Sequence, residues 1–115
     1  MFFKDHTNDK VGKFYEWVAS LFLSLKGYII LQKRFKTKVG EIDIVAAKGP
    51  VLIAIEVKFR RNKSELPYTI SNRQQARIRR TLEFAHKKDP LYQMLRCDTL
   101  LISPYKWPIH IKNAF

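Results

Sequence analysis

Two pairs of charged residues stand at alternate positions in neighbouring stretches of the chain. Glu41 and Asp43 are two residues apart in one apolar stretch, and Glu56 and Lys58 are two residues apart in the next. Side chains alternate along a β-strand, so all four share one face if the stretches form an antiparallel hairpin. Three carboxylates on one face suit a hard divalent cation such as Mg²⁺, which can activate water, and Lys58 could then neutralise an attacked phosphate.

A tight turn between the two stretches sets the expected register. The dipeptide Lys48-Gly49 is the predicted turn, because glycine tolerates the positive φ that such turns require. This turn places Asp43 opposite Ala54. Glu41 then faces Glu56, and two opposed carboxylates require a cation, a basic neighbour or wide solvation. An ordinary solvated charged face is the alternative to a metal site, and the opposite face of the hairpin is apolar, with Ile42, Ile44, Ile53, Ile55 and Val57.

Glu16 is a further candidate carboxylate, in the first predicted helix. It stands in an otherwise apolar run, and its helical neighbours are small, namely Gly12, Ala19 and Ser20. Small neighbours leave room for a ligand to approach the carboxylate. A lone glutamate on an exposed stripe is the alternative interpretation.

The elements that position these residues follow from local signals. Gly27 is suited to end the first helix, Ser71 or Asn72 can begin the second, and Pro90 follows it. Runs rich in β-branched and aromatic residues predict the strands. We predict one mixed α/β domain over residues 1–115, in the order α-β-β-β-α-β-β, with helices covering a central sheet. The predicted helices are 9–26 and 72–88, and the predicted strands are 28–35, 41–46, 51–59, 97–103 and 109–112.

Composition excludes several classes of protein. The 115 residues are 46% hydrophobic, which is enough for one buried core. A single cysteine, Cys97, and three scattered histidines exclude an internal disulfide framework and a multi-cysteine zinc cluster. The polar start of the chain lacks the layout of a secretion signal, and the apolar stretch Phe14–Leu25 is too short to span a bilayer, so we expect a buried helix and a cytoplasmic protein.

Basic residues cluster on both sides of the carboxylate hairpin. The chain carries 22 Lys and Arg against 10 Asp and Glu, a net charge of +12. Arg73, Arg77 and Arg80 recur at helical spacing, where like charges repel unless a polyanion covers them; a solvated helix face is the alternative. The expected partner is nucleic acid first and an acidic membrane surface second. The predicted nucleic-acid-binding residues are Lys33, Arg34, Lys36, Lys38, Arg60, Arg61, Arg73, Arg77 and Arg80.

An ordered set of motifs covers nearly the whole chain. It comprises Gly12-x-x-x-Glu16-x-x-Ala19, Gly27-Tyr28, Gly40-Glu41-Ile42-Asp43-Ile44-Val45, Glu56-Val57-Lys58-x-Arg60, Arg96-x-Asp98 and His110-x-x-Asn113-Ala114-Phe115. The set resembles the YraN-like group of bacterial proteins, which are similar to archaeal Holliday-junction resolvases and belong to the PD-(D/E)XK nuclease superfamily.

The resemblance implies a restriction-endonuclease-like sheet and assigns roles to five residues. Asp43 and Glu56 would bind Mg²⁺ or Mn²⁺, and the carbonyl of Val57 would add a ligand. Lys58 would orient water or stabilise the charge on phosphorus, and Glu16 would bind a second metal or position water. Through its place near the start of the second helix, the resemblance also adds Gln75 as a contact to nucleic acid.

The implied function is hydrolysis of DNA phosphodiester bonds, with branched DNA in repair or recombination as the substrate. A non-catalytic nucleic-acid-binding accessory protein on the same scaffold is the alternative, and a membrane-surface or protein-interaction domain is the weaker third. A resolvase makes paired cuts, so a homodimer stays open. Cys97 is expected to be a buried small hydrophobe, and Arg96 with Asp98 a structural ion pair.

Overall fold

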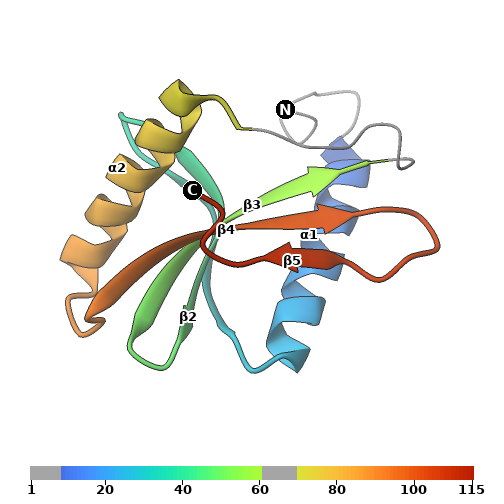
Figure 1. Ribbon diagram of the computed structural model, residues 1–115, viewed down its shortest axis with the longest axis horizontal. Helices are drawn as coiled ribbons and strands as arrows, with labels where there is room; N and C mark the ends of the chain where they lie inside the picture. The colour runs from blue at the N-terminus through green and yellow to red at the C-terminus, as the bar shows by residue number, and fades with distance from the viewer. Residues whose placement is uncertain (1–8, 61–69) are drawn as a thin grey trace.

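The computed structural model describes residues 9–60 and 70–115. Its element order is the predicted α-β-β-β-α-β-β (Figure 1). The helices α1 and α2 and the second helix's Ser71 cap agree with the sequence prediction, whereas β4 begins three residues earlier than expected. The elements are α1 (Asp9–Leu25), β1 (Ile29–Lys36), β2 (Glu41–Lys48), β3 (Val51–Phe59), α2 (Asn72–Lys88), β4 (Met94–Ile102) and β5 (Ile109–Ile111).

The five strands form one mixed sheet in the order β1-β2-β3-β4-β5. Strands β3 and β4 are parallel, and every other neighbouring pair is antiparallel. Parallel strands cannot be joined by a tight turn, so the chain crosses over between them, and α2 forms this crossover. The predicted mixed sheet flanked by helices is therefore confirmed.

The register of the β2–β3 hairpin differs from the predicted one. Lys48 pairs with Val51, so the turn residues are Gly49 and Pro50 rather than Lys48 and Gly49. Gly49 has a φ of +56°, and the negative φ that proline fixes suits the position after it. Because each β3 partner moves by two residues, the side chains keep their faces.

This correction changes which carboxylates oppose each other. Ile44 pairs with Ile55, and continuing the ladder places Asp43 opposite Glu56 instead of Ala54. Glu41 pairs with Lys36 of β1 rather than facing another acid in the register. The two most buried acids of the hairpin are therefore direct neighbours.

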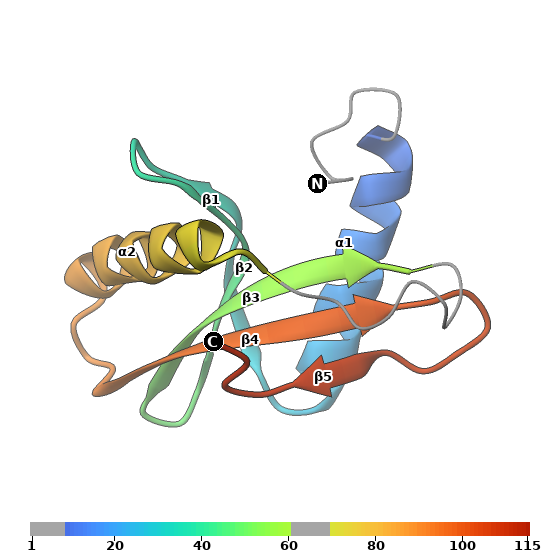
Figure 2. The same ribbon diagram turned by 45° about the horizontal axis from the view of Figure 1, so that its top comes forward.

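The two helices cover opposite faces of the sheet (Figures 1 and 2). Ala19 and Leu23 of α1 pack on one set of alternate residues from β2 and β3, and Ile78 and Leu82 of α2 pack on the other. The predicted apolar face is confirmed for four residues and wrong for Ile42, which packs in the cluster under α2. The four on the α1 side are Ile44, Ile53, Ile55 and Val57.

The outer face of α1 contradicts the prediction of a buried helix. Phe14 and Trp17, which belong to the stretch expected to be buried, are each 55% exposed. A helix that packs on a sheet buries only the stripe that faces the strands, so an apolar outer stripe stays uncovered. Within the described residues no helix is long and apolar enough to cross a membrane.

Gly40 allows α2 to approach the start of β2. A Cβ at this position would lie 3.0 Å from Oγ1 of Thr81 and 3.4 Å from Cβ of Arg77. Thr81 is fully buried, and its hydroxyl donates to the Arg77 carbonyl at 2.7 Å, so it has little room to move. We expect Gly40→Ala to destabilise the protein by about 1–3 kcal/mol in urea unfolding.

A double-mutant cycle separates this clash from a general effect at the strand end. Thr81→Ala removes Oγ1, the atom nearest to the added Cβ. Gly40→Ala should therefore lower the free energy of unfolding by at least about 0.5 kcal/mol less in the Thr81→Ala background than in the wild type. Strict additivity of the two substitutions would show that Gly40 is not needed for close approach of α2.

Candidate functional site

Asp43 and Glu56 form a buried carboxyl pair in the middle of the sheet. Each residue is only 3% exposed. The backbone N–H of Val57 donates to Oδ2 of Asp43 at 2.9 Å, which fixes that side chain. Burial raises the pKa of Asp43 well above its usual range, the hydrogen bond and charge of Glu56 raise it further, and the Val57 N–H and the Lys58 charge oppose this only in part. Asp43 thus binds a proton more tightly than an isolated aspartate does.

Helix α2 begins beside this pair. The Ser71 hydroxyl caps the helix by accepting a hydrogen bond from the backbone N–H of Gln74 at 3.2 Å. The Gln74 amide Nε2 donates to Oε2 of Glu56 at 2.8 Å. Ser71-x-x-Gln74 has the spacing of a capping box, but the glutamine turns to the sheet instead of back to the cap.

Gln74, rather than its neighbour Gln75, is the α2 side chain that reaches the carboxyl pair. The predicted contact of Gln75 to nucleic acid stays a prediction. The amide of Gln75 donates to the backbone carbonyl of Ile70 at 2.8 Å. The two glutamines are adjacent, so the rotation of the helix decides which one faces the strand. The cap at Ser71 is the sequence signal that could have identified Gln74, since it fixes where the helix begins.

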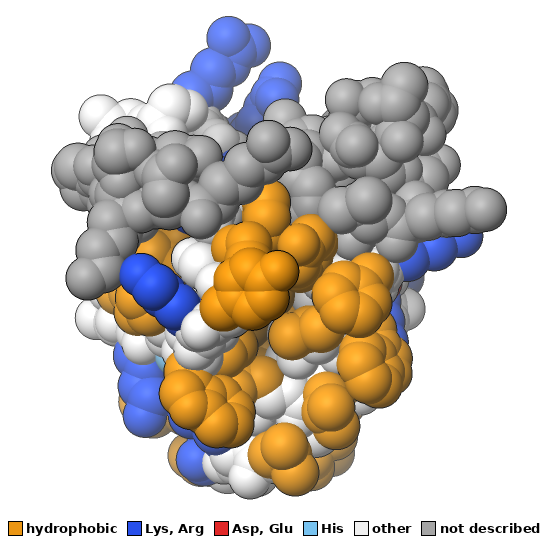
Figure 3. Space-filling model, turned by 90° about the vertical axis from the view of Figure 1, so that its right-hand side faces the viewer, with side chains coloured by type: hydrophobic (Ala, Val, Ile, Leu, Met, Phe, Trp, Pro, Cys, Tyr) orange, Lys and Arg blue, Asp and Glu red, His pale blue; other side chains and the backbone are white. Residues whose placement is uncertain are grey.

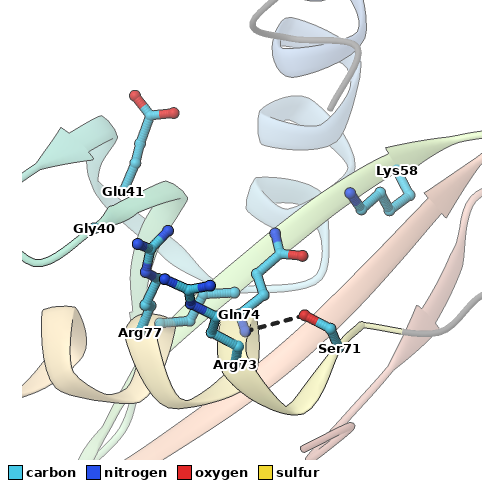
Figure 4. A pocket seen from close by; sticks show the side chains of 8 residues that line it. Gly40, Glu41, Lys58, Ser71, Arg73, Gln74 and Arg77 are labelled. Carbon is cyan, nitrogen blue, oxygen red and sulfur yellow. Dashed lines mark hydrogen bonds between the residues drawn. The ribbon is translucent and has the colours of Figure 1, made fainter.

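A pocket of about 430 Å³ opens beside the pair, between α2, the start of β2 and the end of β3. Figure 4 shows Gln74 rising from α2 between Lys58 and Arg77, while Glu41 points away from α2. The Glu41 carboxylate lies 3.5 Å from the ammonium of Lys36. The lining residues are Gly40, Glu41, Lys58, Ser71, Arg73, Gln74, Arg77 and Ile78.

The pocket has three basic residues in its lining and lies next to the buried carboxyl pair. Lys58, Arg73 and Arg77 bring cationic groups to its lining, and Gln74 connects the lining to the buried Glu56. Guanidinium and ammonium groups bind phosphate oxygens, and paired carboxylates bind hard cations. Chemically, the arrangement can hold an anionic group beside a divalent cation.

Glu16 lies apart from this pocket. Its carboxylate is buried on α1 and accepts a hydrogen bond at 2.9 Å from Nε of Arg34. Within residues 9–60 and 70–115, no group of three or more His, Cys, Asp or Glu side chains is placed to hold a metal. The structure therefore brings Asp43, Glu56 and Lys58 together and leaves Glu16 with Arg34. The ligand roles of Glu16 and of the Val57 carbonyl stay predictions.

The predicted nucleic-acid-binding residues fall on two parts of the molecule. Arg73, Arg77 and Arg80 are exposed on α2, and the first two line the pocket. Arg60 follows β3 directly, while Arg61 lies outside the described residues. Arg34 differs from the others because its Nη2 is buried with no hydrogen-bond partner in the described part of the chain. The exposed basic residues on β1 and the β1–β2 connection are Lys33, Lys36 and Lys38.

A further buried carboxylate, Asp98 of β4, organises the side of the sheet formed by β4 and β5. It accepts two hydrogen bonds from Arg96, one from His110 and one from the Asn113 N–H, all at 2.8 Å. Burial alone would raise the pKa of Asp98, but the hydrogen bonds from His110, Arg96 and Asn113 outweigh it and lower the pKa. The predicted Arg96–Asp98 ion pair is confirmed, whereas His110 was not placed by sequence reasoning.

Cys97 is buried, as predicted for a small hydrophobe. Burial raises the pKa of its thiol to about 11. A thiol with such a pKa stays protonated at neutral pH and is a poor nucleophile. Nothing therefore assigns it a chemical role.

The fold is a mixed α/β sheet with one helix on each face, and its site is a buried carboxyl pair beside a basic pocket. The model of the uncharacterised protein family UPF0102 matches residues 15–102. The chain belongs to this family, and the predicted YraN-like resemblance is thereby confirmed.

Relatives from several bacteria extend over most of the chain. A UPF0102 protein of Mesorhizobium japonicum is 37% identical over 102 residues, covering 87% of this chain and 82% of the relative. One from Sinorhizobium medicae is 37% identical over 108 residues, covering 92% and 88%. One from Maricaulis maris is 39% identical over 106 residues, covering 90% and 84%.

Proposed function

We propose that this protein is a divalent-metal-dependent nuclease that hydrolyses phosphodiester bonds in DNA. The observation that carries the proposal is the buried Asp43–Glu56 pair beside a pocket lined by Lys58, Arg73 and Arg77. Two carboxyl groups buried together are unfavourable unless a proton or a cation lies between them. A basic pocket next to them suits the phosphate groups of a nucleic acid.

The residues present fit a hard cation such as Mg²⁺ or Mn²⁺. Both ions prefer oxygen ligands, and Mg²⁺ is commonly held by one or two carboxylates with water and substrate phosphate. Asp43 and Glu56 would supply those carboxylates, and the backbone N–H of Val57 keeps the Asp43 carboxylate in place. When bound, such a cation lowers the pKa of water and stabilises negative charge on phosphate.

The other pocket residues have separate tasks in this proposal. Lys58 neutralises the attacked phosphate, and Arg73 and Arg77 hold neighbouring phosphates through their guanidinium groups. Gln74 donates to Glu56 and so fixes the orientation of that carboxylate. A carboxylate held in one orientation costs less reorganisation when it binds a cation.

Branched DNA is the proposed substrate shape. Exposed basic residues lie in two separate parts of the fold near the pocket. Lys36 and Lys38 are at the end of β1 and in the β1–β2 connection, and Arg73 and Arg77 are on the helix α2. Two basic surfaces that meet at a pocket can contact two duplex arms at the same time. Repair or recombination is the process in which such DNA would be met.

One observation favours a second function, a non-catalytic nucleic-acid-binding accessory protein. Glu16 is engaged by Arg34, so among residues 9–60 and 70–115 only Asp43 and Glu56 are placed to hold a cation at this site. A site that holds its cation weakly would bind DNA without cutting it.

A cleavage assay decides between the two functions. Labelled linear, single-stranded, flapped and four-way DNA, with a matched RNA, is incubated with Mg²⁺ or Mn²⁺. We expect cutting by the wild type, with four-way or flapped DNA preferred, and a loss of about 10³-fold or more in Asp43→Ala and Glu56→Ala. Glu83→Ala, which removes an exposed acid from α2, is the matched control and should cut normally.

Three outcomes are informative. Cutting that both substitutions abolish while DNA binding persists supports the nuclease. Salt-sensitive binding without cutting of any substrate supports the accessory protein. Cutting that survives both substitutions would contradict the assigned site.

DNA binding itself tests the basic residues of the pocket lining. We expect Arg73→Ala and Arg77→Ala each to weaken binding several-fold and to reduce the salt dependence by about one counterion per contact. Arg79→Ala removes the same side chain from the same helix but outside the pocket, so it should have a smaller effect. Equal losses in all three variants would show that α2 attracts DNA by charge alone.

A further inference from the structure

The outer face of α1 carries a row of exposed apolar side chains. Phe14 and Trp17 are each 55% exposed, Leu21 is 46% exposed and Leu25 is 78% exposed. Their spacing of three and four residues places them on one side of the helix. We call these four residues the α1 stripe.

The α1 stripe does not belong to the core beneath it. Ala19 and Leu23, on the opposite side of the helix, are fully buried against the sheet, and Glu16 is buried as well. No charged side chain is therefore exposed on α1 between the two ends of the stripe. The solvent face of a surface helix is normally polar. Figure 3 shows hydrophobic side chains running down this side of the molecule with no acidic side chain among them.

The size of the stripe is what a small interface needs. At these exposures the four side chains present on the order of 500 Å² of surface, given the areas of aromatic and leucine side chains. Two such faces brought together remove about 1,000 Å² from water, which is the lower bound for a specific interface. The largest apolar patch of a monomeric protein is about 300–600 Å² and often has a function, and one stripe falls in this range.

We propose that the α1 stripe binds the same stripe of a second copy of this chain, with the two helices antiparallel about a two-fold axis. An interface about a two-fold axis requires a self-complementary surface, and a stripe with aromatic residues at one end and leucines at the other provides this when two helices run in opposite directions. One copy's Phe14 then meets the other's Leu25, and one copy's Trp17 meets the other's Leu21. The bulky tryptophans lie near the centre, where hot-spot residues concentrate.

The chemistry of the stripe disfavours other occupants. None of its four side chains offers a cation for the phosphates of nucleic acid or for an acidic protein segment; the exposed Lys13 lies one turn before Trp17, at one end of the stripe. The stripe also lies on α1, which covers the face of the sheet opposite α2 (Figure 2). Residues of α2 line the pocket, so pairing through α1 leaves the pockets of both copies open. The inference goes beyond the proposed nuclease function and does not depend on it.

The net charge of the chain predicts how dimerisation depends on salt. Each copy carries a net charge of +12, so the two copies repel each other at low salt. Salt screens this repulsion and strengthens apolar burial, so dimerisation should tighten as salt rises. DNA binding by the basic pocket should weaken under the same change.

Sedimentation equilibrium of the full chain without DNA tests the proposal. The 13.6 kDa chain is measured from about 1 to about 100 µM at low and high NaCl. We expect a monomer–dimer equilibrium that shifts toward dimer at high salt, and at least a tenfold weaker dimer for Trp17→Lys and Leu21→Lys. Leu91→Lys, at an exposed apolar position between α2 and β4, is the matched control and should dimerise normally.

The result that overturns the proposal is equally specific. A monomer at every concentration and salt contradicts it, and so does a dimer that neither α1 substitution weakens. Circular dichroism melts of the variants check that the exposed substitutions leave the fold intact. Because cleavage is not the readout, failure of the nuclease proposal cannot be mistaken for failure of the dimer.

Discussion

Asp43→Asn is expected to stabilise the metal-free protein while abolishing DNA cleavage. Burial raises the pKa of Asp43, and Glu56 raises it further, so the ionised carboxylate is unfavourable in the folded state. An asparagine keeps the acceptor for the Val57 N–H and can donate its amide hydrogen to Glu56. We expect a gain of about 1–2 kcal/mol in urea unfolding at neutral pH with a chelator present.

The pH dependence of this effect has a definite sign. A carboxyl group whose pKa is raised on folding binds more protons in the folded state, so stability falls as pH rises from the ordinary aspartate pKa to the raised one. Above the raised pKa, the full free-energy cost of burying the ionised carboxylate lowers the stability of the folded protein. The advantage of Asp43→Asn over the wild type should therefore be small at acid pH and grow as pH rises through this window.

A divalent cation should reverse the order of stability. Millimolar Mg²⁺ or Mn²⁺ that binds the carboxyl pair stabilises only the folded wild type, so its melting temperature should rise while that of Asp43→Asn stays constant. Glu83→Gln neutralises an exposed acid on α2 and should respond to the metal as the wild type does. A destabilised Asp43→Asn protein would show that the pair is not held under charge repulsion.

Removal of Asp98 should destabilise the protein more than Gly40→Ala does. Asp98→Ala leaves the guanidinium of Arg96 and the ring of His110 without their buried acceptor. Breaking a buried pair by removing one partner costs about 3–5 kcal/mol, which is a large share of the stability of a small domain. Urea unfolding at pH 7 measures this loss.

Asp98 should also give stability a pH dependence opposite to that of Asp43. Because its pKa is lowered on folding, it contributes stability above the ordinary aspartate pKa, and this contribution is lost as pH falls through the lowered value. In Asp98→Ala, the stability should no longer show this decrease at acid pH. Asp89→Asn is the control. Asp89 caps the end of α2 through its backbone N–H, which the substitution keeps, so stability should change by less than about 1 kcal/mol. Equal losses in both variants would contradict a special role for the Asp98 cluster.

The sequence predicts elements well where local pattern determines them. The bounds of β3 and α2 agree because alternation, helical spacing, the Ser71 cap and Pro90 all act within a few residues. The start of β4 does not follow from such a pattern, because Met94 and Leu95 join the sheet by pairing with Val51 and Leu52. The length of a strand is then set by its neighbour, which local propensity does not contain.

The site could be predicted in part for the same reason. Alternation alone placed Asp43 and Glu56 on one face, and a turn error that moved the register by two residues left that face unchanged. The choice between Gln74 and Gln75 depends on how α2 is rotated against the sheet. The contact of His110 with Asp98 links β5 to β4. It forms only when these strands pair in the folded sheet, so no local sequence pattern predicts it.

The strand order has a consequence for how the site is built during synthesis. Each strand of the sheet lies beside the strand that precedes it in the chain. The hairpin of β2 and β3, which carries both carboxyls, therefore leaves the ribosome complete before α2 does. Its two strands can pair at once because only a tight turn separates them, whereas Gln74 and Arg77 arrive later with the crossover to β4. The carboxyl pair and Lys58 are thus encoded in the earlier segment of the chain, and Arg73, Gln74 and Arg77 are added later with α2.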